Sequence, residues 1–311
     1  MQLRASNRWT LVALATVYVI WSSTYLAMRW MVEALPPLLA AGARFTLAGG
    51  ALYIGVRALG HRAPTKREWL ASLPTGAALF VVGNGFVAIA EREVSSGLAS
   101  VVCGTMPLVL ASLHALWGER PTGRDLGGMA LGLAGVVVIA YSELRGASGN
   151  ARLLLFAPLG WALGSLLARK LRQAPGMTGA ATQMLSGGVL AFVAGAATGE
   201  HLPAGPVAPR AILAFAFLVV FGSLVAYSAY HYLLSHARPA LATSYAYVNP
   251  LLAVLLGVLL GGERFRSELI VGGGLVVSGV FVVARGSSRP RPRSELAVES
   301  TPLVRGGPDP V

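Results

Sequence analysis

The sequence predicts an all-α integral membrane protein with ten transmembrane helices, arranged as two inverted five-helix repeats. Three observations predict this fold class. Of the 311 residues, 55% are apolar and only 12% are charged, whereas soluble domains are about 25% charged. A mean hydropathy of +0.64 shows that the apolar excess runs through the whole chain. Finally, short segments of the first half recur in the same order in the second half.

Apolar runs bounded by charged or turn residues define the ten helices, because a bilayer core requires about 20 helical residues per span. The first run resembles a secretory signal, but its apolar part has the length of a span, so we interpret it as an uncleaved helix. Residues 286–311 are rich in proline and poor in apolar residues, which predicts a disordered cytoplasmic tail. We expect the spans at 9–28, 35–57, 69–90, 96–117, 123–142, 153–170, 177–198, 210–234, 239–261 and 268–285.

The basic residues predict the orientation of these spans. With the N-terminus inside, 17 of the 25 Lys and Arg residues fall in cytoplasmic segments, seven fall on the opposite side and Arg44 lies within a span. This bias predicts that both termini lie in the cytoplasm. We expect the protein in the inner (plasma) membrane. The net charge of +12 does not indicate nucleic-acid binding, because no basic stripe with interleaved aromatic residues is present.

An internal repeat supports the division into two halves. Residues 97–107 align with 240–250 at an offset of 143, and 128–135 align with 272–279 at an offset of 144. Residues 21–29 align with 161–169 at an offset of 140. The repeats are then 9–142 and 153–285. Because each contains five spans, the second enters the membrane from the opposite side, an arrangement that places a binding site near the midplane between the repeats.

Several of these segments also carry family motifs: WSSTYLAMR (21–29), AGARF (41–45), MPLVL and WGER (106–120), and NPLLAVLLG and GGER (249–264). Together they resemble the EamA family of the drug/metabolite transporter superfamily, over roughly residues 9–285. The resemblance implies an inner-membrane carrier with a central cavity, usually an exporter of amino acids, related metabolites or toxic compounds. Asn249 departs from the acid that many relatives carry at this point, which weakens any coupling scheme based on a carboxylate there.

Arg44 is the strongest candidate for a binding residue. It falls near the middle of the second span, where an arginine costs about 2.5–3.5 kcal/mol to insert. All thirteen acids map to loops, helix ends or the tail, so no fixed counter-ion is evident. The guanidinium could therefore face a watery cavity and bind a carboxylate of a substrate, or it could bind backbone carbonyls and fix helix packing. Its counterpart in the second repeat is near Gln183, which is uncharged.

Aromatic and amide residues supply the other candidates for a cavity wall. A largely apolar pocket with few polar groups suits small molecules, although such residues also serve as packing and interfacial anchors. The candidates are Trp21, Tyr25, Asn84, Trp161, Tyr227, Tyr230, Tyr245, Tyr247 and Asn249.

Two prolines and two charged pairs mark the helices that repeat. Pro107 and Pro250 fall within the fourth and ninth spans, where each releases a backbone carbonyl and is either a hinge or a static bend. The pairs Glu119-Arg120 and Glu263-Arg264 end these same helices, and we expect them to be solvated or paired locally. The glycines of GMALG and GGGLVVSG are typical of helices that approach closely.

These features favour a secondary carrier that exports small metabolites, such as amino acids, related zwitterions or drugs, by alternating access. Its partners would be a small-molecule substrate and the lipid bilayer, and a homodimer is left open. No Walker motif, GxSxG, HExxH or pair of carboxylates within the spans is present, and the single Cys103 excludes a CxxC metal site, so no cofactor or metal is expected. A membrane-embedded enzyme or a structural membrane protein are the alternative interpretations.

Overall fold

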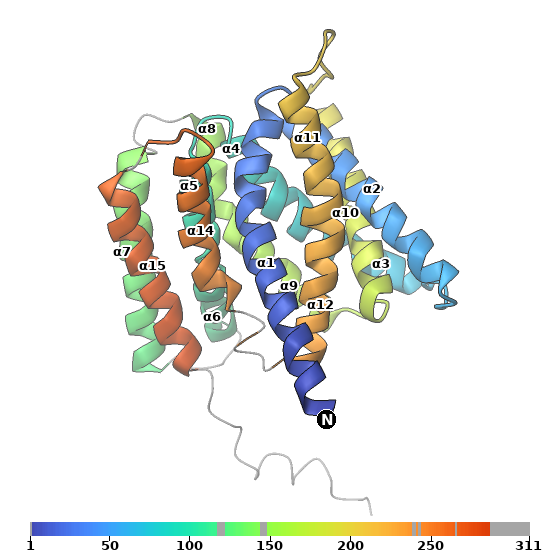
Figure 1. Cartoon of the computed structure of the whole chain (residues 1–311), viewed down its shortest axis with the longest axis horizontal. Helices are drawn as coiled ribbons and strands as arrows, with labels where there is room; N and C mark the ends of the chain where they lie inside the picture. The colour runs from blue at the N-terminus through green and yellow to red at the C-terminus, as the bar shows by residue number, and fades with distance from the viewer. Residues whose placement is uncertain are drawn as a thin grey trace, which may run out of the picture.

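A computed structural model describes residues 2–116, 122–143, 148–237, 241, 244–264 and 266–286. These residues form a bundle of helices without strands (Figure 1). The predicted tail and the pair Glu119-Arg120 lie outside the described residues. The elements, labelled as in Figure 1, are α1 (Gln2–Val32), α2 (Pro37–Ala58), α3 (Lys66–Gly76), η1 (Ala77–Gly85), α4 (Phe86–Ala90), α5 (Ser96–Cys103), α6 (Met106–Leu116), α7 (Gly123–Glu143), α8 (Gly149–Arg152), η2 (Leu153–Phe156), α9 (Ala157–Lys170), α10 (Gly176–Ala197), α11 (Pro209–Phe217), η3 (Leu218–Val225), α12 (Ala226–His236), α14 (Tyr245–Leu259) and α15 (Ser267–Gly286).

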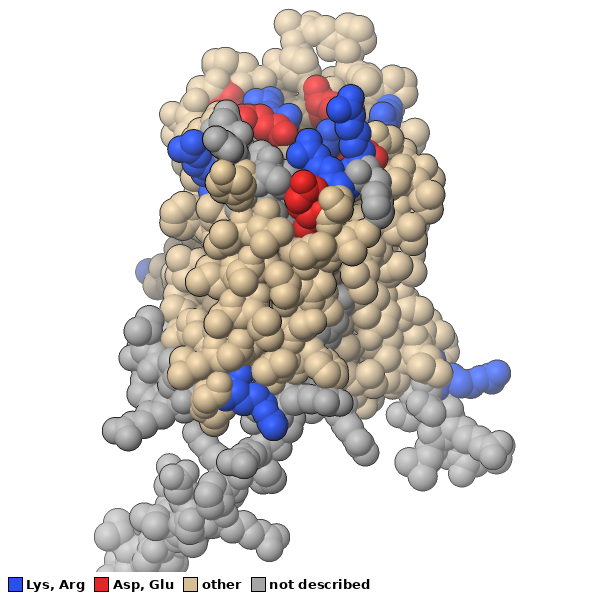
Figure 2. All heavy atoms as spheres, turned by 90° about the vertical axis from the view of Figure 1, so that its left-hand side faces the viewer, with Lys and Arg blue, Asp and Glu red and all other residues tan. Residues whose placement is uncertain are grey.

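The helices have the length and composition that a bilayer requires. Within the described part of the chain, seven are long and apolar enough to cross a membrane: Arg8–Val32, Pro37–Ala58, Lys66–Ala90, Ser96–Leu113, Gly149–Lys170, Gly176–Ala197 and Pro209–Leu233. Val248–Leu259 and Ser267–Val283 are shorter apolar helices. On the face that Figure 2 shows, acidic and basic side chains gather at one end of the bundle, a few basic ones lie at the other, and the surface between is almost free of charge. Many large apolar side chains are exposed, as expected where the solvent is lipid.

Two helix pairs pack side by side at backbone distance, and each joins the two predicted repeats. One pair is α2 with α10 and the other is α7 with α15. At the first, a Cβ atom on Gly42 would lie 2.6 Å from the backbone nitrogen of Phe192. At the second, a Cβ atom on Gly279 would lie 2.6 Å from the backbone nitrogen of Gly132. The prediction that the glycines allow close helix approach is therefore confirmed.

The breaks between helices differ from those that the prolines predict. Pro250 lies inside α14, as expected for the ninth span. Pro107 does not bend a continuous helix, because Gly104 and Thr105 form a turn and Pro107 is the second residue of α6. At that position a proline has no hydrogen bond to break, since the first turn of a helix leaves its N–H groups unpaired. The fourth span is thus interrupted directly before Pro107, after Cys103, and the role of Pro107 as a hinge or a static bend stays a prediction.

Acidic side chains from the second half of the chain cap helices of the first half. The residue before α2 is Pro36, which has no side-chain oxygen to cap the helix. The carboxylate of Glu200, which follows α10, accepts hydrogen bonds from the backbone nitrogens of Leu38 at 3.1 Å and Leu39 at 2.8 Å. A negative group is favourable there because the N-terminus of a helix carries a partial positive charge.

We expect the substitution Glu200→Ala to destabilise the protein, because two backbone donors at the start of α2 would lose their acceptor. The loss should be about 1 kcal/mol, the typical value of a helix cap. Thermal unfolding in detergent would measure it as a lower melting temperature. Glu200→Gln is the matched control, since its amide oxygen still accepts a hydrogen bond, and an equal loss in both variants would show that the cap is not the cause.

Candidate functional site

A cavity of about 110 Å³ lies within the bundle. This is smaller than the roughly 300–1,000 Å³ of pockets for drug-sized ligands, so a small solute suits it best in this conformation. Its wall combines aromatic, apolar and polar side chains, with a single charged group among the lining residues. These are Trp21, Thr24, Tyr25, Met28, Arg44, Phe45, Phe80, Asn84, Val87, Cys103, Met106, Trp161, Met184, Gly222, Ser223, Tyr227, Tyr245 and Asn249.

Arg44 supplies the one charge of the cavity wall and is 5% exposed. Its Nε atom donates a hydrogen bond of 2.9 Å to Oγ of Ser223 on η3. The guanidinium carbon also lies 4.6 Å from the centroid of the Phe45 ring, a contact that stabilises a cation without neutralising it. Within the described residues, no hydrogen bond is formed by either of the two terminal nitrogens. The structure therefore holds the guanidinium in place through Nε and leaves its fork available.

Four aromatic rings from α1, α12 and α14 form a cluster. Trp21, Tyr227 and Tyr245 line the cavity, whereas the predicted candidate Tyr230 is not among the lining residues. The ring of Trp21 lies 4.9 Å from that of Tyr245 and 5.1 Å from that of Tyr230, and Tyr227 approaches it edge-on at 6.5 Å. Trp21 Nε1 also donates a hydrogen bond of 3.3 Å to the carbonyl oxygen of Gly222. Because these rings come from helices separated by about 200 residues of sequence, tertiary packing alone creates this polarisable surface.

Polar side chains of the wall are anchored by neighbouring helices. The Oδ1 atom of Asn249 accepts a hydrogen bond of 3.2 Å from Oγ of Ser22 on α1. The Nδ2 atom of Asn84 donates a hydrogen bond of 3.1 Å to the carbonyl oxygen of Leu79. Both Asn84 and Ser223 lie on π-helical segments, η1 and η3, whose looser turns are frequent at functional sites.

The structure brings together most of the residues that the sequence predicts for the site, but not all. Trp21, Tyr25, Arg44, Asn84, Trp161, Tyr227, Tyr245 and Asn249 line the cavity. Gln183 does not, because its neighbour Met184 takes the wall position on α10. Its Nε2 atom instead faces Gln173 at 3.5 Å, in the packing between α10 and α3. The side chain of Tyr247 lies outside the described residues.

An ion pair joins distant parts of the chain at one end of the bundle. Arg29, near the end of α1, donates a hydrogen bond of 3.1 Å to the Glu263 carboxylate, which follows α14. Glu263 also accepts hydrogen bonds from the backbone nitrogens of Ser96 at 2.8 Å and Gly97 at 3.4 Å at the start of α5. Its side chain is only 6% exposed. The expectation that Glu263 is solvated or paired locally is therefore wrong, because the helix N-terminus and Arg29 both attract it.

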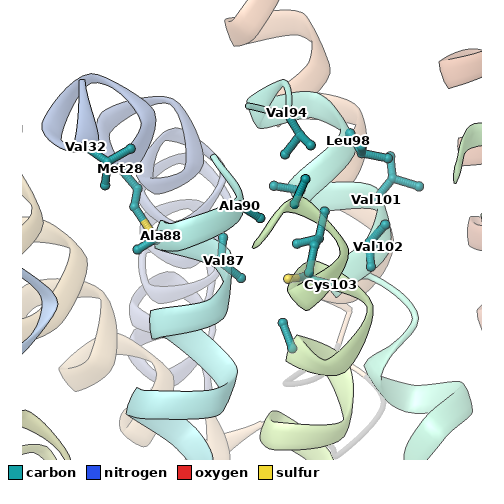
Figure 3. Close-up of a cluster of buried hydrophobic side chains, with 14 of the residues drawn as sticks. Met28, Val32, Val87, Ala88, Ala90, Val94, Leu98, Val101, Val102 and Cys103 are labelled. Atoms are coloured by element: carbon teal, nitrogen blue, oxygen red, sulfur yellow. The ribbon is translucent and has the colours of Figure 1, made fainter. Parts of the chain in front are cut away.

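Glu91 is a buried acid that the sequence analysis missed. It directly follows α4 and is 2% exposed, and neither oxygen of its carboxylate has a hydrogen-bond partner among the described residues. Ala90 and Val94, one residue before and three residues after Glu91 in the sequence, belong to the apolar cluster that Figure 3 shows. Burial raises the pKa of Glu91 well above its usual value, and the nearby Glu263 carboxylate adds to this effect.

Two arginines act against the effect of burial on Glu91. Glu91 interacts electrostatically with both Arg44 and Arg29, which favour its charged form. Its place at the end of an apolar run made it look solvated in the sequence. The signal that could have found it is its spacing of four residues from Val87, which puts both side chains on the same face of the helix.

Comparison with known proteins shows the family of this chain. The model of the EamA-like transporter family matches residues 8–141 and 151–285. The uncharacterized inner membrane transporter YedA of Escherichia coli K12 is 40% identical over 276 residues, which cover 88% of this chain and 90% of that protein. The S-adenosylmethionine/S-adenosylhomocysteine transporter of Chlamydia trachomatis serovar L2 is 30% identical over 287 residues, which cover 85% of each chain.

A solved crystal structure shows the same fold, with a TM-score of 0.62 and 20% identity, over 92% of this chain and 99% of that one. The apolar helices, the uncharged belt and the interior cavity are those of an integral membrane protein. Two matches to one family model cover nearly the whole described bundle. The chain therefore belongs to the EamA-like transporter family.

Proposed function

We propose that this protein is a secondary carrier that exports small metabolites with a carboxylate group, such as amino acids or related zwitterions, by alternating access across the inner membrane. The observation that carries the proposal is the buried Arg44, held through Nε to Ser223, with its fork free at the cavity wall. A planar guanidinium binds a carboxylate through two parallel hydrogen bonds. A carboxylate in the cavity would accept hydrogen bonds from the terminal N–H groups of Arg44, which lipid chains cannot do.

The remaining wall suits the other parts of a zwitterion. No acid lines the cavity within the described residues, so an ammonium group would have to bind neutral partners. The faces of Trp21, Tyr227 and Tyr245 offer cation–π contacts, which are worth about 2 kcal/mol when water is excluded. The apolar side chains Met28, Phe80 and Met184 would contact the hydrocarbon part of a substrate.

The C. trachomatis relative supports this substrate class. Its printed name identifies a transporter of S-adenosylmethionine and S-adenosylhomocysteine. Both compounds carry the α-carboxylate and α-ammonium groups of an amino acid, together with an aromatic base. The same three chemical groups are the ones that Arg44 and the lining rings of Trp21, Tyr227 and Tyr245 would bind here.

For the architecture, we propose ten spans in two inverted repeats, 9–142 and 153–285, with both termini in the cytoplasm. The helix pairs α2 with α10 and α7 with α15 support the repeats, because each helix packs on its counterpart in the other half. Glu200 and Glu263 follow the same pattern, since each acid caps a helix of the first half. In inverted repeats, rocking of one half against the other opens the site to each side in turn.

The proposal can be tested by exchange across liposomes that contain the purified protein. Liposomes loaded with one unlabelled compound would be diluted into the same compound in radioactive form, and uptake would be followed over time. The panel would contain the natural L-amino acids, S-adenosylmethionine and, for each amino acid, its amide. We expect exchange of at least one carboxylate compound and roughly tenfold slower exchange of its amide, because a neutral amide loses the charge-assisted bond to Arg44.

Protein-free liposomes and liposomes with heat-denatured protein are the controls for leakage. Equal exchange of a carboxylate and its amide would overturn the role of the cavity charge. An absence of exchange for every compound would overturn the proposed substrate class. Efflux from cells that overproduce the protein, loaded with a dipeptide of the best substrate, would then test the direction of transport.

A further inference from the structure

The end of the bundle where Arg29 pairs with Glu263 contains a second group of buried polar side chains. Glu91 and Ser96 contribute buried oxygen atoms that have no hydrogen-bond partner among the described residues. Both lie beside the ion pair, because Ser96 donates its backbone N–H to Glu263 and Glu91 interacts electrostatically with Glu263 and Arg29. Neither residue is needed to explain the substrate-binding wall.

An ionised carboxylate is unfavourable at this place. Removing an unpaired charge from water costs far more than removing a neutral acid, and a buried acid therefore keeps its proton. Glu91 is 2% exposed, and Ala90 and Val94, one and three residues away from it in the sequence, belong to the buried apolar cluster of Figure 3. In the closed arrangement the neutral acid is thus the favoured form, although two arginines are close enough to interact with its charge.

The groups around Glu91 give its proton a mechanical consequence. A neutral Glu91 leaves Arg29 fully engaged with Glu263, which is the arrangement observed. An ionised Glu91 would repel the Glu263 carboxylate and compete with it for Arg29. Because an ionised carboxylate also gains from contact with water, its formation favours an arrangement in which this end is open.

We propose that Glu91 is a proton-binding site, and that the proton it binds stabilises closure of the bundle at the Arg29–Glu263 end. By linkage, opening of this end releases the proton and closure takes it up. A carrier with this property exchanges a proton with one side of the membrane each time that end opens. The proposal adds a proton site to the proposed carrier, and it is tested without any transported compound, so that either can fail alone.

Other charged and titratable groups at this end do not provide an alternative proton site of the same kind. Helix α4 packs on α1, α2, η1, η2 and α8. Arg92 and Glu93, which follow Glu91, are exposed, as is Arg152 on α8. The groups that face Glu91 from the elements around it, or interact with its charge, are Tyr25 and Arg29 on α1, Arg44 on α2, Cys103 on α5 and Glu263 after α14.

The first measurement detects the proton. Infrared spectra of the purified full-length protein in lipid nanodiscs, recorded over a range of pH, would follow the carbonyl stretch of protonated carboxylic acids. We expect the wild-type protein to keep such a band at neutral pH, Glu91→Gln to lose it, and the matched control Glu93→Gln to keep it. A wild-type spectrum without this band at neutral pH overturns the proposal, whether or not any variant folds. A band that survives in correctly folded Glu91→Gln also overturns it.

The second measurement detects closure. Cys103 is the one cysteine of the sequence and lines the cavity, so its rate of alkylation by N-ethylmaleimide reports on access to the cavity. Because alkylation itself speeds up with pH as the thiol ionises, the wild-type rate is divided by that of Glu91→Gln at each pH. A charged Glu91 disfavours the Cys103 thiolate and so lowers this ratio, which means that a rise in the ratio reports on access to the cavity. We expect this ratio to rise by about tenfold from acid to alkaline pH, within the usual range of coupling between two sites.

Glu263→Gln supplies the reference for an open end, because it removes the charge that holds Arg29 and the start of α5. Cys103 of Glu263→Gln should be alkylated rapidly. The ratio of its alkylation rate to that of Glu91→Gln should be high already at acid pH. A ratio of wild-type to Glu91→Gln rates that stays flat with pH overturns the link between the proton and closure.

Discussion

Replacing Arg44 with glutamine is expected to reduce the affinity of the carrier for carboxylate substrates by about 10- to 100-fold. The guanidinium fork would otherwise form charge-assisted hydrogen bonds with the substrate, which are worth about 1.5–3 kcal/mol, and a factor of ten corresponds to about 1.4 kcal/mol. The change would be measured as a higher half-saturation concentration in liposome exchange. The half-saturation concentration of Arg44→Lys should lie between those of the wild type and Arg44→Gln, because lysine keeps the charge but loses the planar fork.

The matched control is Arg57→Gln, which removes an exposed arginine from the same helix. It should leave exchange unchanged. For the amide of the best substrate, Arg44→Gln should perform nearly as well as the wild type, since the amide does not need the cation. If Arg44→Gln folds and exchanges carboxylates with the wild-type affinity, Arg44 does not bind the substrate. Its role is then in helix packing, through the hydrogen bond to Ser223.

Replacing Gly279 with leucine is expected to produce the largest loss of stability. A Cβ atom at this position would lie 2.6 Å from the backbone nitrogen and 3.0 Å from Cα of Gly132 on α7. Backbone atoms cannot move aside as a flexible side chain can, so α7 and α15 would have to separate. Overpacking of this kind costs about 3 kcal/mol, and a lower melting temperature in detergent would measure it.

Gly274→Leu is the control for this substitution, because Gly274 lies on the same helix and no atom comes within 4 Å of a Cβ built there. This side chain would extend into open space at the outside of the bundle, where leucine is favourable in lipid. We expect a melting temperature equal to that of the wild type or higher. If Gly274→Leu and Gly279→Leu destabilise the protein equally, the cause is a general intolerance of α15 to bulk and not contact with α7.

Much of the cavity wall could be predicted because its residues violate what lipid would accept. An arginine in the middle of a span, as at Arg44, has a high cost unless it faces a polar interior. Amides such as Asn84 and Asn249 follow the same rule, and the aromatic residues Trp21 and Tyr245 were identified as candidates with them. The family motifs also marked the segment that contains Trp21 and Tyr25.

The remaining features depend on which helix faces meet, and a single sequence does not contain that information. Glu263 and Arg29 are separated by 234 positions, and nothing local distinguishes their pairing from two solvated charges. Gln183 and Met184 are neighbours, yet a rotation of about 100° per residue along a helix places only Met184 at the cavity. The turn at Gly104 and Thr105, directly before Pro107, has no strong signal of its own in the sequence.

The two π-helical segments affect how the selectivity of such a protein can diverge. Carbonyl oxygens there accept side-chain hydrogen bonds, from Trp21 at Gly222 and from Asn84 at Leu79. Part of the polar character of the site thus belongs to the main chain, which amino-acid replacement does not alter. Point substitutions at these positions would change the volume and shape that a ligand meets. Deletion of a single residue, which converts a π turn into an α turn, would move these carbonyl oxygens away from their present partners. We therefore expect insertions and deletions in these two segments to change specificity more than point substitutions do.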